Sequence, residues 1–230
     1  TDYNLPKPFL LGHEATGVVM KTGPECSYVQ GGDYVIATWV RRNPIKGRYL
    51  PDLKGVSYQE KKLNCRITFT WSEIIMSEDE YIVKIPKKYA TPESCIVGCS
   101  ILTGAGAVKN TAKVKPGETV AIFGVGGIGL AAVKMASLLN ASKIIAIDID
   151  SEKLEFSKQF GATHTINSIE NNPIDEIIDI TNGGVDYAFD AIGKKITMNQ
   201  IFESIKQGGS GADNVGGTSI LIGIPLSLIH

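Results

Sequence analysis

Residues 119–129 read Thr-Val-Ala-Ile-Phe-Gly-Val-Gly-Gly-Ile-Gly, and this stretch decides the fold. The first five residues form a run typical of a buried strand, and a tight glycine turn follows at 124–129. The composition and spacing of residues 128–140 then predict a helix. The turn matches the pattern Gly-x-Gly-x-x-Gly, which between a strand and a helix is typical of dinucleotide-binding βαβ units.

The glycines of this turn have distinct expected roles. Gly124 permits the tight turn, Gly126 lets the backbone approach a pyrophosphate, and Gly129 lets the helix pack closely on the strand. The N-terminus of the helix, with Gly127 and Ile128 in its first turn, presents free N–H groups and the positive end of its dipole to phosphates. The alternative, an ordinary glycine-rich turn in a chain with 25 glycines, is less favoured because of the flanking strand and helix.

Asp148 ends a second apolar strand, predicted at 143–148, and follows Gly129 by nineteen residues. A carboxylate at this place can accept hydrogen bonds from both ribose hydroxyls of an adenosine. It would also repel a 2′-phosphate, so NAD is expected rather than NADP. Ile149 joins Asp148 in the predicted cofactor-binding set. Lys153 could reach a ribose hydroxyl, although a solvated helix lysine explains it equally well.

Strands and helices alternate after this point. Asp150 or Ser151 can cap a helix that runs to Gln159, with Gly161 as its C-terminal glycine. Further strands are predicted at 164–166, 185–192 and 218–223, further helices at 174–180 and 196–207, and a surface loop at 207–217. This alternation predicts an α/β fold with a doubly wound parallel sheet covered on both faces.

The first part of the chain has a different character. From Leu10 to Pro86 it is punctuated by glycines and carries short β-branched or aromatic runs at 16–20, 34–40 and 81–85, which predict an irregular, mostly β domain. The pattern changes after Thr91-Pro92, and 230 residues suit two modest domains.

Composition excludes several classes of function. Lys+Arg of 23 against Asp+Glu of 24 gives no basic footprint for nucleic acid or an anionic membrane surface. The apolar stretches are far shorter than the roughly 20 residues of a membrane helix, and residues 1–11 do not resemble a secretory signal. Four cysteines without a two-residue-spaced pair favour a reducing compartment over a disulfide scaffold or a self-contained zinc site. We therefore expect a soluble, cytoplasmic protein with a small-molecule partner.

Two separate segments carry residues that can bind a metal. Residues 12–17 read Gly-His-Glu-Ala-Thr-Gly, and residues 95–100 read Cys-Ile-Val-Gly-Cys-Ser, followed by Thr103-Gly104. The first segment, with Gly23 after it, resembles the zinc signature of medium-chain alcohol dehydrogenases, and the second resembles the segment that gives this family its distal zinc cysteine. Together with the glycine turn, the resemblance covers essentially all 230 residues.

The resemblance implies a catalytic zinc. His13 and Cys99 match two of the three protein ligands of the family, and Glu14 matches the carboxylate beside them, which can tune the charge of the metal or briefly replace its water. Zinc takes imidazole and thiolate ligands at about 2.0 to 2.3 Å and keeps an open position in catalytic sites. Taken alone, His13 would be a hydrogen-bonded histidine and Cys99 a small core residue, but the joint pattern favours a shared ion beside the nicotinamide.

The resemblance also implies residues along the cofactor. Thr103 and Ile128 are expected near the nicotinamide, Ile192 with Gly193 and Ile222 along the cofactor, and the backbone of Ile224 at the carboxamide. An isoleucine at a strand end is more commonly a core residue. The implied domains are a GroES-like catalytic domain at 1–99, truncated at its N-terminus, and an NAD-binding Rossmann domain at 100–230, truncated at its C-terminus.

The chain departs from the family pattern in two places. The third zinc ligand of the family, a cysteine far upstream of His13, and its proton relay are expected outside the chain, so the chain is interpreted as an internal fragment with little zinc or activity by itself. Many members also carry a four-cysteine zinc lobe between Val40 and Arg66, where only Cys65 stands here, and the basic residues from Arg41 to Lys62 are interpreted as a solvated loop. Cys26 and Cys95 are interpreted as packing residues.

The sequence therefore predicts an oxidoreductase that transfers hydride between an alcohol or aldehyde and NAD at a catalytic zinc. Its full-length form is expected to be a homo-oligomer, without nucleic-acid or membrane partners. Two alternatives remain open: an NAD(P)H-dependent reductase of an activated double bond, and a nucleotide-binding fragment without catalysis.

Overall fold

The computed structural model describes residues 8–43, 56–65, 68–209 and 215–224. The chain divides into two compact units, Thr1–Cys99 and Ser100–His230, which we call the N-terminal and the C-terminal unit and describe separately. None of the described helices is long and apolar enough to cross a membrane.

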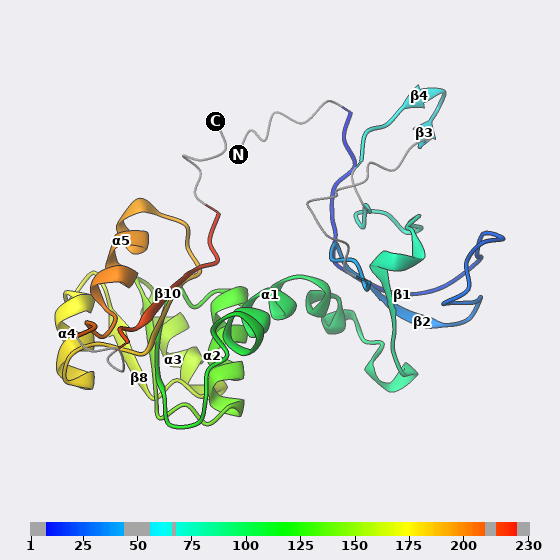
Figure 1. Ribbon diagram of the computed structural model, residues 1–230. Helices are drawn as coiled ribbons and strands as arrows, with labels where there is room; N and C mark the ends of the chain where they lie inside the picture. Colours follow the sequence, from blue (N-terminus) through cyan, green and yellow to red (C-terminus); the bar gives the residue numbers. More distant parts are fainter. Residues whose placement is uncertain (1–7, 44–55, 66–67, 210–214, 225–230) are drawn as a thin grey trace. The chain divides into compact units, whose positions relative to one another are not determined.

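The N-terminal unit is built on a three-stranded antiparallel sheet (Figure 1). Its order is β1-β2-β5, with Ala15 opposite Ala37 and Ile36 opposite Val83. The strands are β1 (Ala15–Val18), β2 (Tyr34–Ala37) and β5 (Ile82–Lys84), and a small hairpin pairs β3 (Ser57–Tyr58) with β4 (Lys61–Lys62). β2 and β5 lie within the predicted runs and β1 begins one residue before its run, and the mostly β prediction for this part is confirmed.

Short 3-10 helices complete this unit. They are η1 (Asp79–Tyr81), η2 (Lys87–Tyr89) and η3 (Pro92–Gly98). Because η3 is a 3-10 helix that ends at Gly98, Cys95 and Cys99 do not share one face of an α-helix. Cys26, half-buried, packs against the core formed by Val29 and its neighbours.

The C-terminal unit contains a five-stranded parallel sheet of order β10-β9-β6-β7-β8. The strands are β6 (Thr119–Phe123), β7 (Lys143–Asp148), β8 (His164–Asn167), β9 (Tyr187–Asp190) and β10 (Thr218–Leu221). The helices are α1 (Ser100–Gly106), α2 (Gly127–Leu138), α3 (Ser151–Phe160), α4 (Pro173–Thr181) and α5 (Lys195–Glu203), and a π-helical stretch, η4 (Ala107–Ala112), follows α1.

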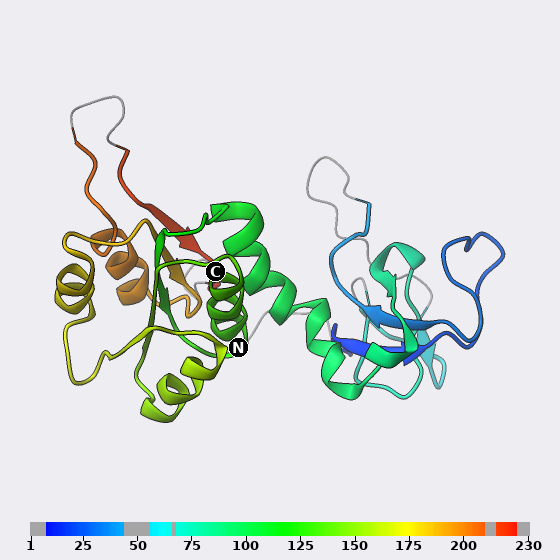
Figure 2. The same cartoon turned by 90° about the horizontal axis from the view of Figure 1, so that it is seen from below.

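Both faces of this sheet are buried. Along β6, Val120 and Ile122 point into one apolar core, and Ala121 and Phe123 point into the other, as the period of two in a strand requires. Figure 2 shows the sheet with α4 and α5, in yellow and orange, on one side and green helices on the other. The predicted fold class, a mostly β GroES-like part followed by a doubly wound Rossmann sheet, is confirmed.

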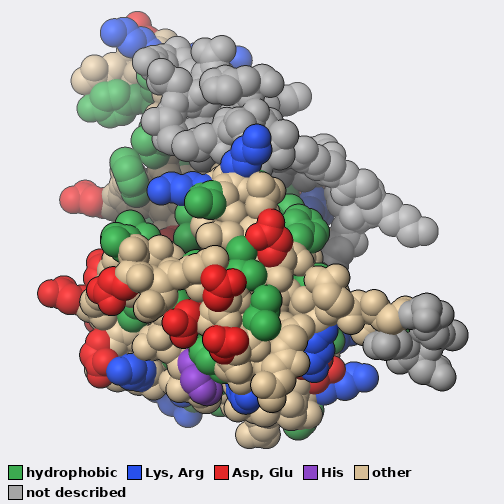
Figure 3. Space-filling view, turned by 90° about the vertical axis from the view of Figure 1, so that its left-hand side faces the viewer, with side chains coloured by type: hydrophobic (Ala, Val, Ile, Leu, Met, Phe, Trp, Pro, Cys, Tyr) green, Lys and Arg blue, Asp and Glu red, His purple; other side chains and the backbone are tan. Residues whose placement is uncertain are grey.

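Local signals set the ends of several helices. The Asp150 carboxylate accepts hydrogen bonds from the backbone N–H groups of Glu152 and Lys153, and Gly161 ends α3 with φ of 112°, as the sequence predicts. The acidic residues in the first turn of α4 interact favourably with the positive end of its helix dipole. Figure 3, seen from the side on which Figure 1 draws α4, shows several acidic side chains among exposed apolar ones.

Several predicted segments extend beyond the elements found, among them the strand predicted at 218–223, which ends at Leu221. The helix predicted at 196–207 ends at Glu203, because the chain turns back and the backbone N–H of Lys206 donates to the carbonyl of Val185. The strand predicted at 185–192 is confined to β9, and Val185 forms only an isolated bridge with Ile205. In the predicted loop 207–217, residues 210–214 lie outside the described residues, as do residues 44–55 of the predicted basic loop.

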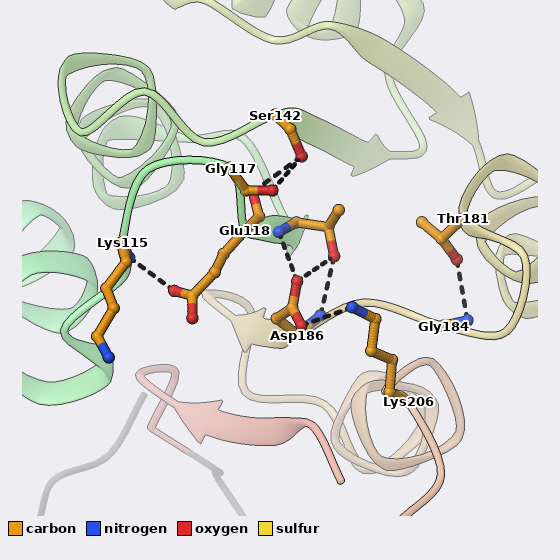
Figure 4. Close-up of polar contacts among 9 residues, drawn as sticks. Lys115, Gly117, Glu118, Ser142, Thr181, Gly184, Asp186 and Lys206 are labelled. Atoms are coloured by element: carbon orange, nitrogen blue, oxygen red, sulfur yellow. Dashed lines mark hydrogen bonds and ion pairs between the residues drawn. The ribbon is translucent and has the colours of Figure 1, made fainter. Parts of the chain in front are cut away.

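A polar network closes the amino edge of the sheet (Figure 4). One carboxylate oxygen of Asp186 accepts from the backbone N–H and the hydroxyl of Thr119, both at 2.8 Å, and the other accepts from Lys206 Nζ at 2.7 Å. Burial raises the pKa of Asp186, but these hydrogen bonds and the charge of Lys206 outweigh burial and hold the pKa below its ordinary value of 3.8. The network joins the starts of β6 and β9.

Candidate cofactor edge and metal pair

The glycine turn at the carboxyl end of β6 is closely packed. Gly124 has φ of 89°, and a methyl group at Gly129 would lie 1.8 Å from the carbonyl oxygen of Gly124. The backbone N–H of Gly124 donates to the carbonyl of Ile147 at 2.7 Å. These contacts require glycine at both positions and place the first turn of α2 directly on the loop.

Gly126 differs from the two buried glycines because it is exposed. Its φ is −72°, and a methyl group built on it would meet nothing within 4 Å. It is the N-cap of α2 without a side-chain cap, so the N–H groups of the first helical turn are available to an anion. Gly127 and Ile128 belong to this turn. The open backbone fits the pyrophosphate of a dinucleotide.

Asp148 is held firmly at the end of β7. One carboxylate oxygen accepts from the backbone N–H of Val125 at 2.9 Å, and the other accepts from the N–H groups of Ile149 at 2.8 Å and Asp150 at 3.2 Å. The glycine turn and the start of α3 are thereby joined through this carboxylate. Each oxygen has two lone pairs, so the oxygen that accepts from Val125 can also accept from one ribose hydroxyl.

Ile149 and Lys153 flank this carboxylate on the exposed side. The side chain of Ile149 is 60% exposed, and Lys153 Nζ lies 3.6 Å from the carboxylate of Asp150. The pKa of Asp150 lies below its ordinary value because the backbone N–H of Lys153 donates to it, which together with the N–H of Glu152 and the Lys153 charge outweighs burial. The Lys153 side chain is half-exposed and lies beside Asp150, close in sequence to the predicted ribose-binding Asp148.

The other predicted cofactor residues meet at the ends of β9 and β10. A methyl group at Gly124 would lie 2.4 Å from Ile192 Cγ1, so the Ile192 side chain rests on the glycine turn. Gly193 has φ of 85°, and a methyl group there would lie 2.7 Å from the carbonyl oxygen of Ile224. Ile222 follows β10 directly. The glycine turn and the segments 191–193 and 222–224 thus form one edge at the carboxyl ends of β6, β9 and β10, where open α/β sheets bind ligands.

Thr103 lies in α1, which packs on the start of α2. A methyl group at Gly104, the next residue, would lie 2.1 Å from the carbonyl oxygen of Ile128. Thr103 and Ile128 therefore belong to neighbouring helical turns.

Sequence reasoning missed Asp190 on this edge. Its carboxylate is fully buried and accepts hydrogen bonds from Ile192, Gly193 and Thr197. The signal that could have found it is an acidic residue directly after the apolar run Tyr187 to Phe189, whereas Asp148 was identified from its spacing to the glycine turn.

In the N-terminal unit, His13 Nε2 lies 3.1 Å from Cys99 Sγ. Cys99 follows η3, whose last residue, Gly98, is held by a hydrogen bond from Thr38 Oγ1 to its carbonyl at 2.7 Å. His13 follows Gly12, which has φ of 92° and lies against Thr70 and Trp71. Two segments 86 residues apart in the chain therefore bring their side chains together.

The pair fits one metal ion. Tetrahedral zinc with nitrogen and sulfur ligands at its usual bond lengths would hold the two atoms about 3.5 Å apart, somewhat farther than the 3.1 Å of the hydrogen-bonded pair. Within the described ranges no group of three or more His, Cys, Asp and Glu side chains gathers around one point. The metal roles of His13, Cys99 and Glu14 stay predictions.

Comparisons with known proteins find two family models that match the chain. The alcohol dehydrogenase GroES-like domain model matches residues 1–87, and the zinc-binding dehydrogenase model matches residues 127–225. Among curated proteins, class-3 alcohol dehydrogenase of Pisum sativum is 36% identical, with 96% of this chain and 63% of the relative covered. S-(hydroxymethyl)glutathione dehydrogenase of Synechocystis is 35% identical, with 94% of this chain and 63% of the relative covered.

Solved structures are similar in the same way. An alcohol dehydrogenase zinc-binding domain protein from Burkholderia ambifaria has a TM-score of 0.83 at 30% identity. The match covers 97% of this chain and 65% of the Burkholderia chain. Benzyl alcohol dehydrogenase from Acinetobacter calcoaceticus has a TM-score of 0.80 at 30% identity, and the match covers 96% of this chain and 63% of the Acinetobacter chain.

The parallel sheet with its glycine turn is a Rossmann-type sheet, and the antiparallel part before it is GroES-like. The chain belongs to the zinc-binding medium-chain alcohol dehydrogenase family. It spans less than two thirds of the length of the curated relatives named above.

Proposed function

We propose that the protein is an NAD-dependent zinc alcohol dehydrogenase that interconverts small alcohols and aldehydes. The observation that carries the proposal is the pair His13 Nε2 and Cys99 Sγ, 3.1 Å apart, because an imidazole and a thiolate at this distance suit one zinc ion. Family membership supports the same assignment.

The proposed metal ligands lie in the N-terminal unit, and the proposed cofactor-binding residues lie in the C-terminal unit. His13 and Cys99 hold the metal, and Glu14 adjusts the charge beside it. Gly126, Gly127 and the N–H groups of α2 bind the pyrophosphate, and the carboxylate of Asp148 binds the adenosine ribose. When bound, zinc supplies a Lewis acid that makes an alcohol more acidic, and NAD supplies the hydride acceptor.

The remaining cofactor residues orient the reactive half. Ile192 rests on the glycine turn. Together with Gly193, Ile222 and Ile224 it offers an apolar surface for one face of a nicotinamide. Thr103 and Ile128 border the other face. An apolar surface excludes water from a hydride path. Asp148 also favours NAD over NADP, since a 2′-phosphate would meet a carboxylate there.

The names of the relatives suggest a substrate panel. One relative is an S-(hydroxymethyl)glutathione dehydrogenase and one solved structure is a benzyl alcohol dehydrogenase. We propose primary, aryl and thiol-adduct alcohols as the substrates to compare. We also propose that the full-length protein is a homo-oligomer, which light scattering would test.

The decisive experiment measures NAD reduction by the full-length protein with this panel, before and after zinc is removed by a chelator and then restored. The proposal predicts turnover that is lost with the metal and regained with zinc, and lost in a His13→Ala variant. Turnover unaffected by zinc removal would refute it. NADPH oxidation with an enone but no alcohol oxidation would identify a double-bond reductase instead, and NAD binding without any turnover would identify a nucleotide-binding protein.

A further inference from the structure

We propose that Asp190 is a positioning residue that shapes the part of the cofactor site on which the nicotinamide half rests. The inference deepens the proposed function and depends on it. Asp190 is the last residue of β9, at the carboxyl edge of the sheet, and its side chain is 0% exposed.

The carboxylate organises the loop that follows β9. One oxygen accepts from the backbone N–H of Ile192 at 3.0 Å and from that of Gly193 at 3.2 Å, and the second oxygen also accepts from Gly193 at 3.2 Å. The first oxygen accepts in addition from the hydroxyl of Thr197 at 3.0 Å. Since Thr197 lies in the first turn of α5, the carboxylate fixes both the loop and the helix that continues it.

The main chain of the same residue fixes the neighbouring segment. The Asp190 carbonyl accepts from the N–H groups of Ile222 at 2.9 Å and Gly223 at 2.8 Å. A methyl group at Gly223 would lie 2.2 Å from the backbone nitrogen of Gly193, so the two segments touch through their backbones. One residue therefore ties together the loops that carry Ile192, Gly193, Ile222 and Ile224.

A carboxyl group at this place is not explained by packing. The three residues before it, Tyr187 to Phe189, are apolar or aromatic and contribute to the sheet and its cores. Burial of a carboxylate is costly unless hydrogen bonds replace its water, and here three donors do so, with the N–H of Gly193 shared between the two oxygens. These donors lie in the loop and the start of α5, so this buried group acts on the shape of the edge.

The order of the strands decides which half of the cofactor is affected. In doubly wound sheets a dinucleotide crosses the edge at the point where strand order reverses, which lies here between β6 and β9. The pyrophosphate crosses at the glycine turn, and Asp148 at the end of β7 takes the adenosine ribose. The other half must therefore extend over the ends of β9 and β10, which Asp190 holds together.

The test compares two ligands on the full-length protein by calorimetry: NADH, which occupies both halves, and ADP-ribose, which lacks the nicotinamide. In Asp190→Ala, NADH affinity should fall about tenfold, while ADP-ribose affinity stays within about threefold of the wild type. The ratio of the two affinities is the readout, since a merely destabilised protein would change both alike.

Asp186→Ala is the matched control. It removes a carboxylate with three hydrogen bonds from the opposite end of β9, and it should lower the melting temperature without changing the affinity ratio. If Asp190→Ala does not fold, Asp190→Asn decides, because the amide replaces one acceptor oxygen by a donor that faces the N–H of Gly193.

Equal losses for NADH and ADP-ribose, or no loss for either, would overturn the inference about Asp190 and leave the proposed function standing. A wild-type protein that binds neither ligand would overturn the proposed function itself, and the inference with it.

Discussion

A substitution at Gly126 should weaken the binding of a dinucleotide without changing the stability of the fold. The substitution Gly126→Ala adds one methyl group at a position with φ of −72° and no atom within 4 Å. The free energy of unfolding should therefore stay within about 0.5 kcal/mol of the wild type. A pyrophosphate against this backbone would be displaced, with loss of about two charge-assisted hydrogen bonds, or roughly 3 kcal/mol. That loss corresponds to an increase in the Kd for NADH on the order of 100-fold.

Gly129→Ala provides the contrast. Its methyl group would lie 1.8 Å from the carbonyl oxygen of Gly124, where contacts under 3.0 Å force a shift. The first turn of α2 must move, and we expect a cost of about 1–3 kcal/mol in stability together with weaker binding. Gly106→Ala in α1, whose methyl group would meet only Asn110 at 3.8 Å, is the control for a harmless addition.

The assay combines urea unfolding with titration of NADH fluorescence for the three variants. The reasoning requires Gly126→Ala to be stable and defective in binding. If this variant binds NADH as the wild type does, the dinucleotide does not cross the turn at Gly126. If it unfolds early, the space over the turn is not open.

Three further perturbations test other parts of the structure. The pKa of Asp186 is lowered in the folded state, so the carboxylate stabilises the fold above its ordinary pKa and this contribution is lost as the pH falls through the lower, folded-state pKa. Urea unfolding between pH 5 and 3 should therefore show a steeper loss of stability in the wild type than in Asp186→Asn, and equal slopes would contradict the assignment. Asp150→Ala removes the N-cap of α3 and should cost about 1 kcal/mol in thermal unfolding, whereas an unchanged melting temperature would show that the cap is dispensable. His13→Ala should lower the zinc-to-protein ratio measured by mass spectrometry of the metal, while an unchanged ratio would place zinc elsewhere.

The fold was predictable where local signals and burial agree. β6 and β7 have the predicted bounds, because buried apolar runs between turns leave few alternatives. The two ends of α3 followed from Asp150 and Gly161, whose capping chemistry is local. By contrast, α5 ends early at Glu203 because Lys206 pairs with Val185, a tertiary contact that composition does not reveal.

The candidate site was predictable to a different extent. The glycine turn and Asp148 are readable from spacing, since one βαβ unit places them together. His13 and Cys99 are 86 residues apart, and only resemblance to a family linked them before their geometry was known. Asp190 was missed because an acidic residue at the end of a strand has several possible functions, and its partners in the loop and α5 are set by the folded chain.

Asp186 directly precedes strand β9 and Asp190 ends it, and this arrangement has a practical consequence. Asp186 and Asp190 are separated by about 13 Å of extended chain, and each carboxylate bonds to a different set of neighbours. Thermal stability could therefore be engineered through the contacts of Asp186 with Thr119 and Lys206, without changing the residues at the proposed cofactor edge. The same short segment therefore offers one position for changing thermal stability and another for changing how the nicotinamide half of the cofactor is held.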